Sequence, residues 1–102
     1  MNVTICIGHN VDGVDTLTTS GIMGTLSHSL ESHGVRDIGL TISDAIGFWN
    51  GEVEASTRIE AWDIDGDTVT ALLSICGEMC HTLHQWEIIA NVDGQIHHVT
   101  RD

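Results

Sequence analysis

Three residues near the end of a predicted helix have side chains that could bind a metal ion. Cys76, Cys80 and His84 recur at every fourth position, so a helix would place them on one face. Thiolate and imidazole groups suit zinc, but C-x-x-x-C is not the spacing of a zinc finger or zinc ribbon. Both cysteines also fall on the apolar stripe of that helix, where a buried cysteine is ordinary core. We therefore expect no metal site and no cofactor. If a metal ion does bind, Cys76, Cys80 and His84 are the candidate ligands.

Two other polar groups carry weaker chemical signals. Asp63, Asp65 and Asp67 resemble the start of a calcium-binding loop, but the distal glutamate of an EF-hand is missing. A turn followed by a helix N-cap at Asp67 explains these aspartates more simply. Cys6 and His9 could form a nucleophile and its base, yet the sequence places no orienting group or oxyanion hole beside them. We therefore expect that the protein is not an enzyme.

The most informative surface is one face of a predicted β-hairpin. Alternation along the chain puts tryptophans and charged side chains on the same side of its two strands. Tryptophan is enriched in protein interfaces, and acidic groups around it would favour a basic partner. The alternative is a solvated sheet surface without a function. The predicted partner-binding residues are Trp49, Glu52, Glu54, Arg58, Glu60 and Trp62, with Asp63 and Asp65 in the turn that follows.

A turn at Asn50-Gly51 fixes the register of this hairpin. The Asn-Gly dipeptide is typical of a two-residue type I′ turn, which would pair Trp49 with Glu52 and Phe48 with Val53. Continued outward, this register places apolar side chains on one face and charged side chains on the other. A slip of one residue would mix the two sets. The apolar face is expected to pack on the core.

The remaining elements define the fold class. We predict a strand over 2–8, a loop, a helix over 15–33, the hairpin strands around 40–61, a helix over 67–85 and a strand over 86–92. This order is that of the ferredoxin-like βαββαβ fold, an α+β fold whose antiparallel sheet has two helices on one face. The chain 1–102 is then a single acidic domain. Residues 95–99 are predicted to form a further short strand, and the sequence does not decide whether this strand joins the sheet.

The charge balance restricts the partners. The 102 residues contain 15 Asp and Glu, three Arg and no Lys, which gives a formal net charge of −12. Such a surface repels nucleic acid and anionic membranes, and it attracts basic proteins. No signal peptide or transmembrane segment is visible, and an odd number of cysteines favours a reducing compartment. We expect a cytoplasmic protein, in the host cell if it is encoded by a phage.

The stretch WNGEVEASTRIE resembles a pattern in uncharacterised small ferredoxin-like proteins of phages and mobile elements. In size and charge the chain also resembles phage-encoded inhibitors of host defence, including anti-CRISPR proteins. This resemblance implies a non-enzymatic inhibitor that mimics nucleic acid and occupies a basic, nucleic-acid-binding surface of a larger partner. Two alternatives stay open: a small metal- or ligand-binding homodimer that uses its Cys and His residues, and an acidic surface adapted to high salt.

Overall fold

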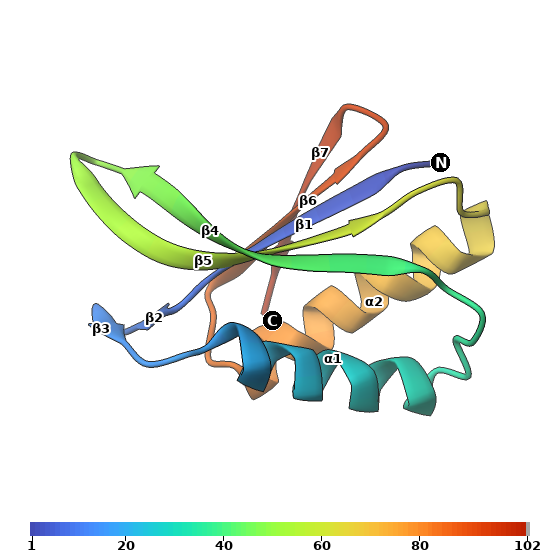
Figure 1. The fold of residues 1–102 in the computed structure, drawn as a ribbon, viewed down its shortest axis with the longest axis horizontal. Helices are drawn as coiled ribbons and strands as arrows, with labels where there is room; N and C mark the ends of the chain where they lie inside the picture. Colours follow the sequence, from blue (N-terminus) through green and yellow to red (C-terminus); the bar gives the residue numbers. More distant parts are fainter. Residues whose placement is uncertain (102) are drawn as a thin grey trace.

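The computed structural model describes residues 1–101, apart from the side chain of Trp49. Its main sheet has five strands in the spatial order β4-β5-β1-β6-β7, and each neighbouring pair is antiparallel. Figure 1 shows β1 in the middle of this sheet. The strands are β1 (Val3–Gly8), β4 (Leu40–Trp49), β5 (Glu52–Ala61), β6 (Glu87–Val92) and β7 (Gln95–Thr100).

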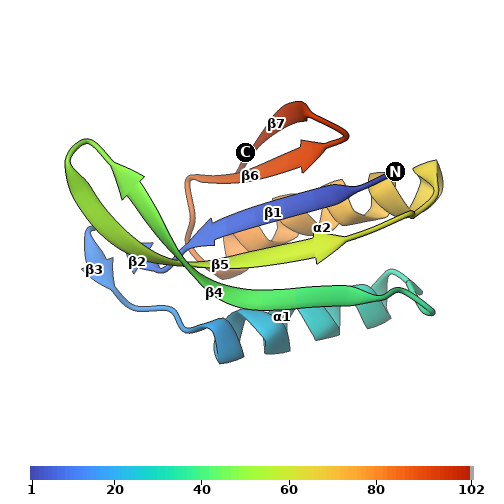
Figure 2. The ribbon, with the colours of Figure 1, turned by 45° about the horizontal axis from the view of Figure 1, so that its top comes forward.

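Two helices cover one face of the sheet and leave the other open. They are α1 (Thr19–Ser32) and α2 (Gly66–Thr82), and Figures 1 and 2 show them side by side beneath the strands. Ile5, Ile22, Ile59 and Ile75 are at most 1% exposed in the core between these layers. The predicted α+β, ferredoxin-like arrangement is confirmed. Within residues 1–101, neither helix combines the length and the apolar character that a membrane crossing needs.

The predicted register of the β4–β5 hairpin is confirmed at every pair. Trp49 pairs with Glu52, Phe48 with Val53, and the ladder continues as far as Leu40 with Ala61. Asn50 and Gly51 both have positive φ, at 50° and 80°, as a type I′ turn requires. The left-handed conformation at two successive positions is the physical reason that Asn-Gly specifies this turn.

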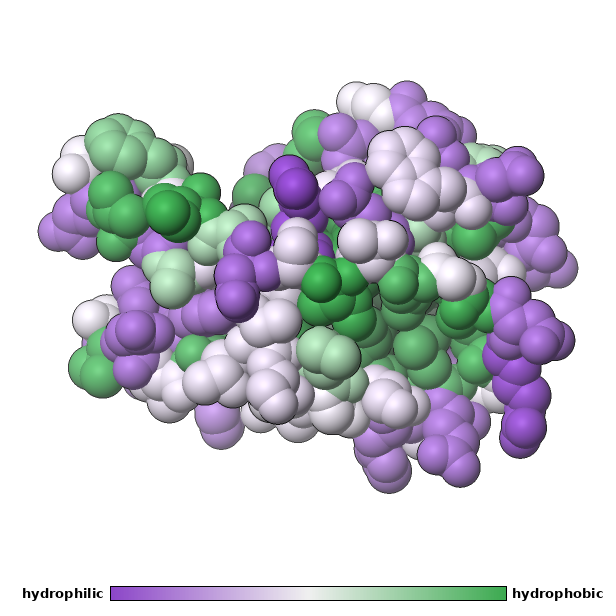
Figure 3. Space-filling model, in the orientation of Figure 1, coloured by the Kyte–Doolittle hydropathy of each residue, from purple (hydrophilic) through white to green (hydrophobic). Residues whose placement is uncertain are grey.

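The expectation that the whole apolar face of the hairpin packs on the core is wrong. Its inner half does so, since Ile59 is 1% exposed, but Ile46, Phe48 and Val53 are 78%, 75% and 66% exposed. The two strands are longer than β1, which ends at Gly8, so their outer half extends beyond the helices. Figure 1 shows this half curving away from the helices, and Figure 3 shows a hollow between it and the rest of the molecule.

Local capping explains why both helices differ from their predicted limits. Helix α1 begins at Thr19 because the Thr18 side chain accepts a hydrogen bond from the Gly21 N–H. Helix α2 begins at Gly66, because Asp65 is its N-cap in place of Asp67 and accepts from the Thr68 N–H.

The sequence pattern missed one short pair of strands and left the place of the C-terminal strand open. The predicted loop after β1 contains a small hairpin of two strands, β2 (Asn10–Val11) and β3 (Val14–Asp15). The C-terminal segment does join the sheet, because β7 pairs with β6 along its whole length. Both hairpins use an Asp-Gly turn with positive φ at each position.

Candidate functional site

An open groove of about 400 Å³ lies on the face of the sheet that the helices leave free. This volume is within the range of small-molecule sites in proteins. The groove runs from the curved part of the β4–β5 hairpin across β1 to β6. We call it the open-face groove, and its lining residues are Cys6, Gly8, Ala45, Ile46, Gly47, Glu54, Ser56, Arg58, Gln85, Glu87 and Ile89.

Strand alternation brings these residues together. Side chains of successive strand residues point to opposite faces, so Cys6 on β1, Arg58 on β5 and Ile89 on β6 share the open face. The strand register places the three at one level, since Cys6 pairs with both Arg58 and Ile89. Glu54 and Arg58 were predicted as site residues. Cys6 was considered only as a nucleophile paired with His9, and Glu87 was missed, although the ferredoxin-like strand order, which puts the first strand in the middle, would have indicated both in this groove.

The carboxylate of Glu54 is held across the end of β1. Its Oε1 atom accepts a hydrogen bond from the Asn10 N–H at 3.2 Å. The Asn10 carbonyl oxygen in turn accepts from Nε2 of Gln85, which is buried, at 3.1 Å. Residue 8 must be glycine for this arrangement, because a Cβ there would overlap the Glu54 carboxylate. Glu54 is therefore a half-buried negative charge with a fixed position.

Arg58 provides the positive charge of the groove. Its Nε lies 3.3 Å from Oε1 of Glu60, a predicted site residue whose side chain is 20% exposed. This contact uses Nε and leaves the two terminal nitrogens of the guanidinium free to bind an anion. Burial raises the pKa of the Cys6 thiol above its usual value, although the Arg58 charge acts in the opposite direction. Cys6 is therefore a neutral thiol at physiological pH.

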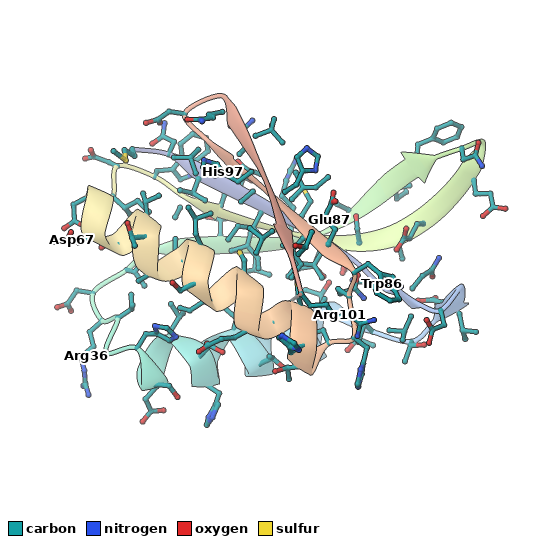
Figure 4. All side chains as sticks on the ribbon, turned by 180° about the vertical axis from the view of Figure 1, so that it is seen from behind. Arg36, Asp67, Trp86, Glu87, His97 and Arg101 are labelled. Carbon is teal, nitrogen blue, oxygen red and sulfur yellow. The ribbon has the colours of Figure 1, made fainter. Side chains whose placement is uncertain are left out.

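Glu87 provides a second carboxylate on the opposite side of the groove. Its Oε1 accepts a hydrogen bond from Nδ1 of His98 at 2.8 Å. The preceding residue, Trp86, is stacked by Arg101, whose Cζ lies 4.1 Å from the ring centroid. Figure 4 shows Trp86, Glu87 and Arg101 together where β6 begins and β7 ends. Both contacts restrict the start of β6 and hence the position of Glu87.

The other predicted partner-binding residues do not form one site with Glu54 and Arg58. Glu52 lies at the tip of the hairpin, whereas Trp62 follows the opposite end of β5, roughly 30 Å away for a strand of this length. Asp63 has a positive φ of 57° in the turn before α2, and Asp65 caps that helix. The Thr68 hydrogen bonds lower the pKa of Asp65. The side chain of Trp49 lies outside what the structure describes.

Of the metal candidates, His84 lies apart from the two cysteines. Cys76 and Cys80 are buried in the core, and burial raises the pKa of the Cys76 thiol to about 12. Helix α2 ends at Thr82, so His84 does not continue their face and is exposed. Among residues 1–101, no three His, Cys, Asp or Glu side chains are grouped so that they could hold a metal ion.

Two solved structures of phage proteins are similar to this chain. A phage SAM lyase in complex with S-methyl-5′-thioadenosine has a TM-score of 0.74 and 18% identity, over 97% of this chain and 88% of that one. A phage SAM lyase in the apo state has a TM-score of 0.71 and 17% identity, over 98% and 81%. No protein-family model matches the chain, and no curated protein does. At this identity the likeness shows that the fold is shared.

These comparisons correct the functional expectation. The prediction of a non-enzymatic inhibitor that mimics nucleic acid is wrong, because the similar proteins are enzymes, and no resemblance to anti-CRISPR proteins is found. The expected phage relationship is confirmed at the level of fold. The basic protein partner and the homodimer stay predictions. The error arose because the acidic side chains of the hairpin were interpreted without the β1 and β6 residues beside them.

Proposed function

We propose that this chain is an enzyme that binds S-adenosylmethionine in the open-face groove and cleaves it to S-methyl-5′-thioadenosine. The observation that carries the proposal is the placement of Glu54, Glu87 and Arg58 around one groove. Support also comes from the fold, since it is shared with a phage SAM lyase that binds S-methyl-5′-thioadenosine.

The charges of the groove complement those of the substrate. S-adenosylmethionine carries two positive groups, its sulfonium and its ammonium, and one negative carboxylate. The groove has the opposite set, with the carboxylates of Glu54 and Glu87 and the guanidinium of Arg58. The ammonium can donate charge-assisted hydrogen bonds to a carboxylate, and Arg58 can donate them to the substrate carboxylate; such bonds are about twice as strong as neutral ones. The sulfonium has no hydrogen to donate, and a carboxylate attracts it by charge alone. The net charge of −12 also attracts a cationic substrate toward the protein.

The reaction that gives this product breaks the bond between sulfur and Cγ of the amino-acid chain. An oxygen of the substrate's own carboxylate attacks Cγ, the S–Cγ electron pair moves to sulfur, and the products are S-methyl-5′-thioadenosine and homoserine lactone. No proton is transferred, so the protein needs no base. Its task is to hold the amino-acid chain of the substrate in a folded conformation. The entropic cost of this ordering is then met on binding and no longer slows the reaction step.

Each charged residue has a defined role in this proposal. Arg58 binds one carboxylate oxygen and leaves the other free to attack, while Glu54 and Glu87 bind the cationic groups. The displacement removes one positive and one negative charge. Ile46 and Ile89 line the same groove and replace water around the substrate with apolar side chains. Such surroundings favour the displacement, because its charges disappear as the products form.

The test is to incubate the purified protein with S-adenosylmethionine and to identify the products by liquid chromatography and mass spectrometry. We expect S-methyl-5′-thioadenosine and homoserine lactone in equal amounts. Glu54→Gln should lower kcat/KM by about tenfold to a hundredfold, because the side chain loses the negative charge that attracts a cationic group of the substrate. Glu52→Gln is the matched control, since it makes the same change at an exposed position on the same strand, outside the groove.

Two results would count against the proposal. If neither product forms and calorimetry detects no binding of S-adenosylmethionine at millimolar concentration, the groove does not serve this substrate. If products form equally well with Glu54→Gln and with Arg58→Gln, the reaction takes place at another site.

A further inference from the structure

The charged side chains of the open-face groove stand at two neighbouring levels of the sheet. The first level is that of Cys6, which pairs with Arg58 on one side and with Ile89 on the other. The second level is that of Gly8, which pairs with Ser56. Cys6 and Gly8 are two residues apart on β1, so the two levels are separated by about 7 Å along the strands.

The first level is positive and the second is negative. Arg58 provides the guanidinium of the first level. At the second level, the Glu54 carboxylate occupies the space that a Cβ on Gly8 would need. Strand β6 runs antiparallel to β1, so its first residue, Glu87, lies at the end of β1 where Gly8 is. The groove therefore holds its opposite charges at a spacing that a single amino-acid chain can bridge.

This pattern matches one part of S-adenosylmethionine, its sulfonium amino acid. The sulfonium, ammonium and carboxylate of that part are joined by only three carbon atoms, and they account for all three charged residues that line the groove, Glu54, Arg58 and Glu87. The adenosine part is uncharged. Among the described residues that line the groove, none is an aromatic residue on which its base could stack. Recognition by charge is thus confined to the amino-acid part.

We propose that the open-face groove acts on sulfonium α-amino acids as a class, including those that carry no nucleoside. S-methylmethionine is the simplest member, because a methyl group replaces the adenosyl group on its sulfur. It keeps the sulfonium, the ammonium and the carboxylate at the same spacing. This inference rests on the proposed function, since it assigns the same reaction to the same residues.

The reaction of S-methylmethionine balances in the same way. One carboxylate oxygen forms a bond to Cγ, the S–Cγ bond breaks, and its electron pair stays on sulfur. The products are dimethyl sulfide and homoserine lactone, whose ammonium group keeps its protons and its charge. A neutral thioether leaves in both reactions, and every bond that changes lies in the amino-acid part. The adenosyl group therefore contributes to affinity and not to the cleavage step.

The experiment compares S-methylmethionine with S-adenosylmethionine as substrates of the purified protein. Dimethyl sulfide is measured by headspace gas chromatography and homoserine lactone by mass spectrometry, and the rate without protein is subtracted. We expect kcat for S-methylmethionine to lie within about tenfold of that for S-adenosylmethionine, and KM to be at least about a hundredfold higher. Contacts with adenosine are made equally before and during the reaction, so their loss changes KM and leaves kcat.

Two variants test whether both substrates use the same groove. Glu54→Gln should lower kcat/KM by the same factor for both, within about threefold, because the charge that it removes faces the part that they share. Glu52→Gln is the matched control, exposed on the same strand and outside the groove, and it should leave both values unchanged.

The outcomes separate this inference from the proposed function. If S-methyl-5′-thioadenosine forms but dimethyl sulfide does not, adenosine is required for cleavage and this inference alone is overturned. If neither substrate is cleaved, the proposed function is overturned and this inference with it. If dimethyl sulfide forms at an unchanged rate in Glu54→Gln, S-methylmethionine is cleaved at another site and the inference is again excluded.

Discussion

The carboxylate of Glu54 occupies the space in which a side chain on Gly8 would lie. The two residues are on adjacent strands, and both line the open-face groove. Gly8 has no positive φ, so its role is to leave room rather than to adopt a special backbone conformation. Because the carboxylate passes over Gly8, it reaches the Asn10 N–H. The absence of a side chain on β1 therefore positions a charge that belongs to β5.

Gly8→Ala should consequently impair the site without unfolding the protein. The added methyl group meets the end of a long side chain, which can rotate away at little cost to stability. The Glu54 carboxylate would then lose the Asn10 N–H, and we expect the affinity for S-adenosylmethionine to fall about tenfold, as measured from KM in the product assay. Gly39→Ala is the control, because a Cβ there meets no atom within 4 Å. Equal affinities in both variants would show that Glu54 need not be held over β1.

Cys6 offers a chemical probe of the groove. Of the three cysteines, Cys6 is exposed whereas Cys76 and Cys80 are buried. We expect one thiol to react with iodoacetamide in the native protein and three in denaturant, as counted by mass spectrometry. Cys6 is accessible but partly covered by the walls of the groove, and this partial burial raises its pKa, so its rate at pH 8 should lie below that of a free cysteine and increase as the pH rises further.

The same reaction reports whether a ligand occupies the groove. Cys6 lines it between Arg58 and Ile89, so saturating S-methyl-5′-thioadenosine should slow the alkylation of Cys6 about tenfold or more. Methionine, which lacks the adenosine part, is the control. It should protect the Cys6 thiol less, because it fills only part of the groove. Unchanged alkylation at a ligand concentration that calorimetry shows to be saturating would place the ligand elsewhere.

The sequence specified the hairpin and the order of elements because both depend on local rules. Asn50-Gly51 has few alternative conformations, and alternation then fixes every pair from Phe48 with Val53 inward. The limits of α1 were less accurate, because Asp15 and Thr18 are both acceptable caps. The structure uses Thr18, since the backbone carbonyl oxygen of His9 accepts hydrogen bonds from the Thr16 and Leu17 N–H groups and keeps that segment out of the helix.

The candidate site could be predicted only in part because it is a property of the assembled sheet. Glu54 and Arg58 were found from one hairpin, but Glu87 lies 29 positions beyond Arg58 in the chain and reaches the groove through the pairing of β1 with β6. The exposed outer half of the hairpin was missed for a related reason. Alternation shows which face of a strand is apolar, but not how far the helices extend beneath it.

The two halves of the hairpin should differ sharply in their contribution to stability. Ile59→Ala removes a fully packed side chain and should lower the free energy of unfolding by about 2–5 kcal/mol. Phe48→Ser, at a position 75% exposed, should change it by no more than about 0.5 kcal/mol. Urea unfolding followed by circular dichroism measures both. A loss of more than about 2 kcal/mol for Phe48→Ser would mean that the outer half is covered in solution.

The absence of lysine should make stability depend on salt in a particular way. With 15 acidic residues and three arginines, the folded chain is destabilised by repulsion among its own carboxylates. Sodium chloride screens this repulsion, so Tm should rise by about 5 °C. Because the Debye length falls from about 30 Å at 0.01 M to about 8 Å at 0.15 M, most of the rise should occur below 0.3 M. A continued rise up to molar salt would instead indicate the adaptation to high salt that the acidic composition also allows.

Asp12→Asn with Glu52→Gln, at two exposed positions, should raise Tm in low salt and have little effect at 0.3 M, since the charges they remove are screened there.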